Sequence, residues 1–261
     1  MKTRAPDTRL GGSALPVLLA CAAVMTTGVW PVGAAPRAGA AASSSAANPE
    51  VLDLLVQLLA AGTSSDRTVA ALGALAKMAA GEKTSDPRVL DLLQLYAGHR
   101  RPEVRREAVI ALGATADARA IPPLVERLGD DNPEVRAAAA EALAARKEVR
   151  AAPRLVRLVR RGDLGAAAPA GRLATPEALA DLCGMQGATN EGVLAVALGS
   201  YVKRTDVSDG TRIEPLRTIA KLHGVEATAA LADYLASIPP RDTRPSKRET
   251  ERLLDERGAD R

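Results

Sequence analysis

The sequence contains few aromatic, cysteine or histidine residues. Among its 261 residues there are no Phe, one Trp, three Tyr, two Cys and two His. The hydrophobic fraction of 47% therefore depends on aliphatic side chains, above all Ala. Ala is the best helix former and is depleted in strands. The composition thus excludes most β-sandwiches and barrels and indicates an all-α fold.

The same scarcity limits the chemistry that the chain can carry. Stacking on bases or sugars needs exposed aromatic faces, so single-stranded nucleic acid and carbohydrate are disfavoured as ligands. The sequence has no Gly-rich phosphate loop and no His/Cys cluster at metal-ligand spacing. We therefore expect no catalytic residue, cofactor or metal. Cys183 is expected to be a small buried residue, and His99 and His223 are expected to face the carbonyl dipoles at helix ends.

The N-terminal segment has the three-part layout of a secretory signal peptide. Three basic residues in the first nine precede an apolar run from Ala14 to Val32, and a small-residue site follows before Ala35. This layout predicts that residues 1–34 are removed on export. The mature protein would then be periplasmic or extracellular and would contain no membrane span.

Two alternatives remain open for this segment. The apolar run of about 19 residues is long enough to cross a bilayer as an uncleaved anchor. The tetrapeptide that ends at Cys21 resembles a lipobox, so Cys21 is a candidate lipidation site. In that case the protein would be a membrane-anchored structural component of the cell envelope.

Cleavage would also change the charge of the chain. Loss of three Lys/Arg and one Asp lowers the formal net charge from +4 to +2. A nearly neutral exported protein is a poor candidate for nucleic-acid binding. Cys183 would be the only remaining cysteine, so no disulfide could form within the mature chain.

Both ends of the mature chain differ in composition from its centre. Residues 35–47 are rich in Ala, Ser and Gly, which is typical of a flexible linker. Residues 241–261 contain seven Lys/Arg and six Asp/Glu. We expect this charged tail to be a disordered end or a short helix that folds back as a polar cap, with a separate docking peptide as the alternative.

Short sequences recur along the centre of the chain, residues 48–240. The seven residues from Pro49 return in similar form from Pro87, and the four from Pro102 return unchanged from Pro133. The displacements are 38 and 31 residues. Internal similarity at such periods is the signature of a solenoid.

Each period contains apolar residues at helical spacing. Val104, Ala108, Ala111 and Leu112 fall on one stripe of a helix. Gly187, Gly192 and Gly199 weaken the helical pattern of one later pair. The expected helix pairs are 49–60 with 66–78, 87–96 with 102–114, 118–128 with 133–146, 149–160 with 164–173, 175–183 with 189–203, and 212–223 with 225–238.

The run from Pro102 to Gly113, the following segment 118–125 and the second copy from Asn132 resemble the HEAT-repeat superfamily. The similarity is closest to bacterial HEAT-like repeats also found in phycobilisome lyase subunits. The resemblance implies an α-solenoid of about five to six helix pairs in a bacterial protein. It also implies a non-catalytic interaction scaffold, with a lyase-like or chaperone-like subunit as the alternative.

The resemblance assigns a structural role to two arginines. Arg105 and Arg136 match the arginines that pair with acids in the turns of adjacent repeats, and Asp130 or Asp131 is the expected partner of Arg105. Contact with a ligand is the alternative role for these arginines.

A candidate partner-binding surface follows if the second helix of each pair lines the concave side, as it does in the proteins this chain resembles. Arg106, Ile110, Ala137 and Glu141 would then face a protein or peptide partner, with Glu103 and Glu134 at the rim. An ordinary solvated helix surface is the alternative. Arg and Tyr side chains are expected to contribute most of the binding energy.

Overall fold

The protein is described by a computed structural model covering residues 49–61, 64–81 and 87–259. The expected signal peptide, Cys21 and the expected linker lie outside these residues. The described residues form thirteen α-helices and two short 3-10 turns, with no strand. The helices are α1 (Pro49–Ala60), α2 (Ser65–Gly81), α3 (Pro87–Ala97), α4 (Pro102–Ala114), α5 (Ile121–Arg127), α6 (Pro133–Ala145), α7 (Ala152–Arg160), α8 (Leu164–Leu173), α9 (Pro176–Cys183), α10 (Glu191–Val202), α11 (Gly210–Lys221), α12 (Val225–Ala236) and α13 (Pro245–Ala259), and the 3-10 turns are η1 (Ala118–Ala120) and η2 (Val149–Ala151).

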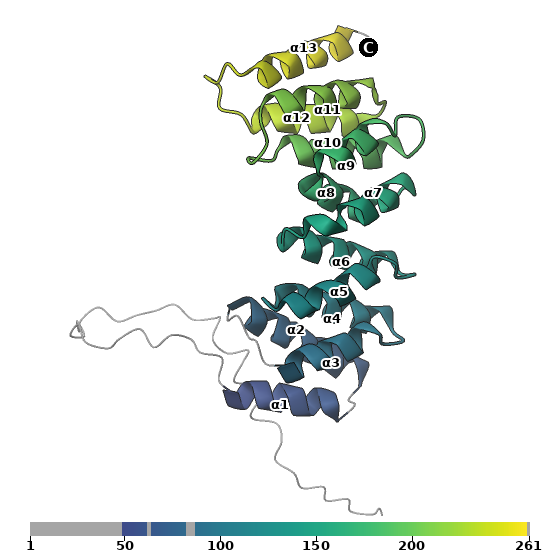
Figure 1. Cartoon of the computed structure of the whole chain (residues 1–261), viewed down its shortest axis with the longest axis vertical. Helices are drawn as coiled ribbons and strands as arrows, with labels where there is room; N and C mark the ends of the chain where they lie inside the picture. Colours follow the sequence, from purple (N-terminus) through teal and green to yellow (C-terminus); the bar gives the residue numbers. More distant parts are fainter. Residues whose placement is uncertain (1–48, 62–63, 82–86, 260–261) are drawn as a thin grey trace, which may run out of the picture. The chain divides into compact units, whose positions relative to one another are not determined.

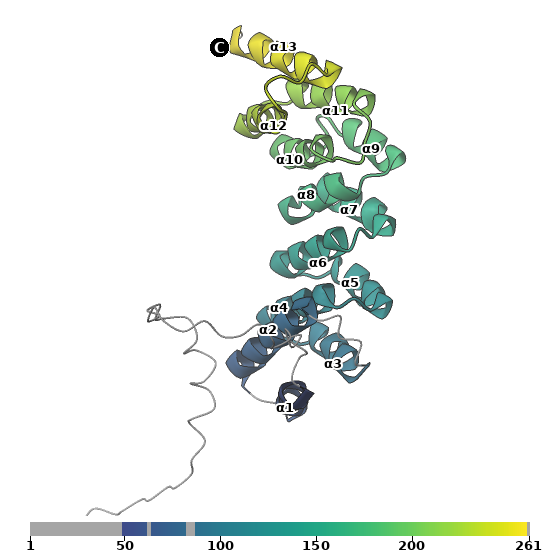
Figure 2. The same ribbon diagram turned by 90° about the vertical axis from the view of Figure 1, so that its left-hand side faces the viewer.

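The described helices form a stack of pairs in two rows (Figures 1 and 2). Even-numbered helices from α2 to α12 contact one another in succession. On the other side, α1, α3 and α5 contact in succession, as do α7, α9, α11 and α13. Each even helix also contacts the odd helix that precedes it. The result is an α-solenoid of six helix pairs followed by α13, and the predicted fold class is confirmed.

Proline and N-capping residues determine where several helices begin. Pro133 occupies the first turn of α6, where a missing N–H costs no hydrogen bond. The Asn132 side chain accepts hydrogen bonds from the Glu134 and Val135 N–H groups. Thr175 caps α9 in the same way through the N–H of Ala178. These caps are local, which explains why the helix starts could be predicted to within a few residues.

The core is a continuous seam of aliphatic side chains between the two rows. Its largest members include Leu72, Leu93, Leu112, Leu143 and Leu198, which are all completely or almost completely buried. Alanines occupy most of the intervening positions. The core is therefore built mainly from leucine and alanine side chains.

Glycines allow the even-numbered helices to approach one another closely. A Cβ at Gly113 would lie 2.6 Å from the Cβ of Ala142, and a Cβ at Gly165 would lie 2.6 Å from the Cβ of Ala137. Gly199, which weakens the helical pattern of α10 in the sequence, packs against Ala230 on α12. A Cβ at Gly199 would lie 3.0 Å from the Cβ of Ala230. The helix is therefore maintained by tertiary packing, which here outweighs the low helix propensity of glycine.

The closest approach in the even row is between α8 and α10. A Cβ at Gly171 would lie 2.0 Å from the backbone oxygen of Ala197 and 2.9 Å from the backbone nitrogen of Tyr201. These contacts are far shorter than van der Waals distance. Only glycine fits at this position.

The C-terminal segment forms α13, which packs on α11 and α12. Ser246, Thr250 and Leu253 on α13 are buried. The Ser246 N–H donates to an Asp209 carboxylate oxygen at 3.0 Å, and Ser246 Oγ is 2.6 Å from the Tyr234 hydroxyl. The helical stack therefore continues beyond residue 240, which is the end expected from the sequence.

We predict that acid loosens α13. Hydrogen bonds from Arg252 and Arg217 lower the pKa of Glu249 to about 2. Because this pKa lies below its unfolded value, the stabilisation is complete above about pH 4.5 and is lost as the pH falls toward about 2. Glu249→Gln should cost about 1 kcal/mol at pH 7, since both arginines are half exposed. Hydrogen exchange of the α13 amides at pH 7 and pH 3 measures the effect.

The matched control is Glu256→Gln, which removes only an exposed pair with Arg252. This variant should retain the acid sensitivity of the wild type. If Glu249→Gln showed the same acid-dependent loosening of α13 as the wild type, Glu249 would not be its source.

Candidate functional site

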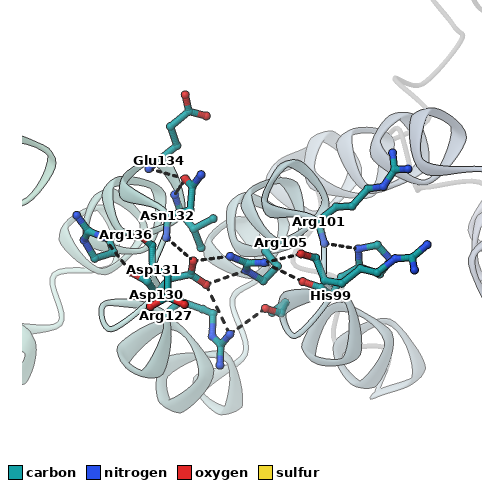
Figure 3. Close-up of polar contacts among 12 residues, drawn as sticks. His99, Arg101, Arg105, Arg127, Asp130, Asp131, Asn132, Glu134 and Arg136 are labelled. Atoms are coloured by element: carbon teal, nitrogen blue, oxygen red, sulfur yellow. Dashed lines mark hydrogen bonds and ion pairs between the residues drawn. The ribbon is translucent and has the colours of Figure 1, made fainter.

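A polar network joins the turns of successive repeats around Arg105 (Figure 3). The guanidinium of Arg105 donates to both carboxylate oxygens of Asp130, from Nε at 2.8 Å and from Nη2 at 2.7 Å. Its Nη1 donates to the carbonyl oxygens of His99 and Arg100 at 3.0 and 3.1 Å. One side chain on α4 therefore connects the turn before its own helix to the turn of the next repeat.

Arg136 repeats this arrangement one unit later. Its Nη1 donates to the carbonyl oxygens of Asp130 and Asp131 at 2.9 and 3.0 Å. Its Nε donates to the Asp163 carboxylate at 2.6 Å. Of the two acids expected as partners of Arg105, the structure pairs Asp130 with it, while the Asp131 side chain is exposed and contributes only its backbone oxygen. Asp163 was not among the expected partners, although it follows Arg136 at almost the spacing at which Asp130 follows Arg105.

The Arg105–Asp130 pair is partly buried. The side chain of Asp130 is 3% exposed and that of Arg105 is 15% exposed. Burial alone would raise the pKa of Asp130, but the hydrogen bonds from Arg105 and from the Asn132 N–H, together with the charges of Arg105 and Arg127, lower it. Asp130 also raises the pKa of Arg105 through its hydrogen bond. Both groups are therefore charged at neutral pH.

A second set of arginines donates to carbonyl groups at the ends of helices in the preceding repeat. Arg127 donates to the Ala97 oxygen at 3.2 Å, and Arg204 donates to the Ala174 oxygen at 2.7 Å. Arg146 donates to the Asp117 oxygen at 2.7 Å and also contacts the oxygen of Thr115. Carbonyls at a helix C-terminus have no partner within their helix. These contacts were not predicted. Each joins an arginine to a carbonyl 29 to 31 residues earlier in the chain, so the contacts follow the repeat period although the arginines themselves are not evenly spaced.

The four predicted partner-binding residues line a single groove over α4 and α6. The groove has a volume of about 700 Å³, and Arg106, Ile110, Ala137 and Glu141 all contribute to its wall. Glu134 lines it as well, as expected for the rim, whereas Glu103 is not among its lining residues. Its remaining walls are small side chains: Gly113, Ala114, Ala138, Ala142, Ala145 and Gly165.

Two of the three charged residues that line the groove are already paired. Arg106 donates to Glu107 at 2.8 Å. Glu141 receives two hydrogen bonds from Arg172 on α8, one of them at 2.9 Å. Ile110 is 36% exposed and is the largest apolar side chain in the groove wall. The groove therefore has an apolar floor of small side chains, with the paired Arg106 and Glu141 at its edges and with Glu134, whose carboxylate has no ion pair among the described residues.

The expectation that Tyr side chains contribute to a binding surface is wrong for Tyr201 and Tyr234. Tyr201 and Tyr234 are buried in the core, and Tyr96 is half-buried with its hydroxyl donating to the Leu59 oxygen at 2.7 Å. The three tyrosines fill volume between helices in a core that has few other large side chains. A partner would meet Arg and aliphatic groups instead.

The remaining candidate residues show no reactive arrangement. Cys183 is half-buried, and burial raises the pKa of its thiol. His99 Nδ1 accepts a hydrogen bond from the Arg101 N–H at 3.1 Å. The His223 ring lies beside the Glu191 carboxylate, 3.2 Å away.

The described part of the chain holds no group of three or more His, Cys, Asp or Glu residues that could bind a metal ion. In the same residues, each helix is too short or too polar to span a membrane.

Comparison with known proteins gives one family match. Residues 89–168 match the sequence model of the family described as HEAT repeats. No curated protein matches the chain.

Three solved structures illustrate the structural similarity. Two are engineered proteins from the Northeast Structural Genomics Consortium, 21% and 22% identical, which cover 80% and 78% of this chain and 97% of their own, with TM-scores of 0.42 and 0.43. The third is a designed armadillo repeat protein, 19% identical, which covers 78% of this chain and 98% of its own, with a TM-score of 0.40. The residues that match HEAT repeats, 89–168, lie within the all-α solenoid.

Proposed function

We propose that this protein is an exported, non-catalytic scaffold that holds a segment of a protein partner in the groove over α4 and α6. Repeat solenoids of this type generally serve protein interaction, because stacked units create extended surfaces. The observation that carries the proposal is the groove itself: a depression of about 700 Å³ with an Ala/Gly floor, one exposed isoleucine, and the charged residues Arg106, Glu134 and Glu141 at its edges.

The chemistry of the groove suits a peptide with small or aliphatic side chains. Such side chains would cover Ile110 and the alanine floor without leaving buried polar groups unpaired. The edge charges would fix the register, since a bound segment must align with Arg106 on α4 and with Glu141 on α6. A lyase-like activity has no comparable support, and the lipid-anchored alternative depends on Cys21, which lies outside the described residues.

Photo-crosslinking in the native host tests this proposal. A photoreactive amino acid at Ile110 should crosslink to a discrete partner, whereas the same probe at Leu95, exposed on α3, should not. Arg106→Glu combined with Glu141→Lys should abolish the crosslink by reversing both edge charges. The charge-matched control is Arg67→Glu with Glu214→Lys, two residues outside the groove. Equal crosslinking from both positions, or a crosslink that survives the groove variant with the fold intact, would refute the groove as the binding site.

A further inference from the structure

A concentration of arginines lies on α7 and on the residues directly before and after it, on the opposite row from the groove. Residues 149–162 contain five Arg and no Asp or Glu. All five are exposed. They are Arg150, Arg154, Arg157, Arg160 and Arg161, and we call them the α7 arginine stripe.

The spacing places these arginines along one side of the helix. Positions 150, 154, 157 and 161 are related by steps of three and four residues, so they share one face, with Arg160 at its edge. The opposite face is occupied by Leu155 and Val159, which are completely buried in the core. The stripe is therefore held rigidly and runs for about 17 Å.

Most members of the stripe lack a compensating charge. Arg154 donates to the Val125 oxygen on α5 at 3.1 Å. The side chains of Arg150, Arg157, Arg160 and Arg161 have no hydrogen bond or ion pair within the described residues, although Arg161 borders a hollow that also contains Asp131 and Asp163. By contrast, the arginines that join successive repeats, such as Arg105, Arg136 and Arg204, are paired with carboxylates or carbonyls. An uncompensated row of guanidinium groups is complementary to a row of anionic groups.

The neighbours of α7 restrict the shape of the anion. α9, which packs against α7, exposes Glu177 and Asp181, and α5 exposes Glu126. These carboxylates would repel a broad anionic sheet such as a lipid headgroup surface. A single extended chain about five residues long, at about 3.3 Å per residue, matches the length of the stripe.

The surroundings also distinguish a peptide from a nucleic acid. Binding of a single nucleic-acid strand relies on aromatic side chains on which bases stack. None of the three tyrosines borders α7's exposed face, because two are buried and Tyr96 hydrogen-bonds to Leu59. A carboxylate-bearing peptide needs only the bidentate guanidinium contacts that the stripe offers.

We infer that the α7 arginine stripe is a second binding surface, which takes an extended acidic segment of a protein. This inference goes beyond the groove and does not depend on it. A partner could occupy both surfaces at once, since they lie on different rows of the solenoid.

A labelled peptide of twelve glutamates is the direct probe, with fluorescence anisotropy as the measurement on the full chain. We expect binding that weakens as salt is raised. Arg157→Glu with Arg160→Glu should reduce affinity by at least about tenfold, because attraction becomes repulsion at the centre of the stripe. Arg157→Gln with Arg160→Gln should give a smaller loss and tests the same point without introducing acids near the end of α7.

Two controls test whether peptide binding depends on the stripe itself, and not on the net charge of the protein or on the groove. Arg67→Glu with Arg248→Glu makes the same change in net charge far from the stripe in sequence and should alter affinity by less than about twofold. The groove variant Arg106→Glu with Glu141→Lys should bind the peptide as the wild type does, so failure of the groove proposal leaves this result unaffected. Equal loss in the charge-matched control would overturn the inference. So would tighter stripe-dependent binding of a single-stranded oligonucleotide or of vesicles containing phosphatidylglycerol.

Discussion

Gly171→Ala is expected to lower the free energy of unfolding by at least about 3 kcal/mol, at the upper end of the range for overpacked cores. The new Cβ would lie 2.0 Å from the backbone oxygen of Ala197. If the neighbouring atom belonged to a side chain, that side chain could rotate away. The neighbouring atom is instead a backbone oxygen within α10, which can move only if the whole helix moves. The substitution should therefore separate α8 from α10.

The solenoid architecture predicts how this loss is distributed. In a repeat protein each unit contacts only its neighbours, so a weakened interface divides the stack into two cooperative segments. We expect Gly171→Ala to unfold in two transitions, with the part after α8 losing structure first. Thermal unfolding followed by circular dichroism, with hydrogen exchange to locate the segments, measures this behaviour. A single transition at the wild-type temperature would contradict the proposed contact.

Two variants serve as controls for glycine replacement. A Cβ at Gly258 on α13 would contact no neighbouring element, because no heavy atom outside the local helix backbone lies within 4 Å of it. Gly258→Ala should therefore be neutral or slightly stabilising. Gly113→Ala should destabilise, because its Cβ meets the Ala142 methyl at 2.6 Å. Adding Ala142→Gly removes that methyl and should restore part of the loss. No such rescue exists for Gly171, whose neighbour is backbone.

The fold could be predicted because its determinants are local and repeated. The Pro102 and Pro133 repeats fix the period, and the apolar stripe around Val104 and Leu112 fixes the helix faces. Even the weak pair that contains Gly199 was placed within two residues of α9 and α10. The role of Gly199 itself could not be predicted, because the residue that it packs against, Ala230, is distant in sequence.

The candidate site was predicted less completely. The repeat offset placed Arg106 and Glu141 on one surface, and the structure brings them together in one groove. It did not identify Arg172, which pairs with Glu141, because that contact depends on how far α8 is shifted along α6. The buried positions of Tyr201 and Tyr234 were missed for a similar reason: composition shows that large side chains are scarce, but not that the core uses them.

Asp130→Ala is expected to cost about 3 kcal/mol, because it leaves a partly buried guanidinium without its carboxylate. Asp130 accepts two hydrogen bonds from Arg105 and a third from the Asn132 N–H at 2.9 Å. The substitution would therefore weaken the junction between two repeats and the turn that begins α6. The matched control is Asp131→Ala, since that side chain is exposed and has no hydrogen bond among the described residues. Its effect should stay within about 0.5 kcal/mol.

We expect the pH dependence of the free energy of unfolding to identify the charged form of Asp130 as the stabilising one. Its pKa is lowered in the folded protein, so its contribution is complete above the unfolded pKa and is lost as the pH falls through the folded value. Urea unfolding between pH 7 and pH 3 should show a smaller acid-induced loss in Asp130→Ala than in the wild type. A double-mutant cycle with Arg105→Ala should give a coupling energy of about 1–3 kcal/mol. Additive effects of the two substitutions would mean that Arg105 is held by the carbonyl groups of its own turn and that Asp130 acts only as a turn-capping residue.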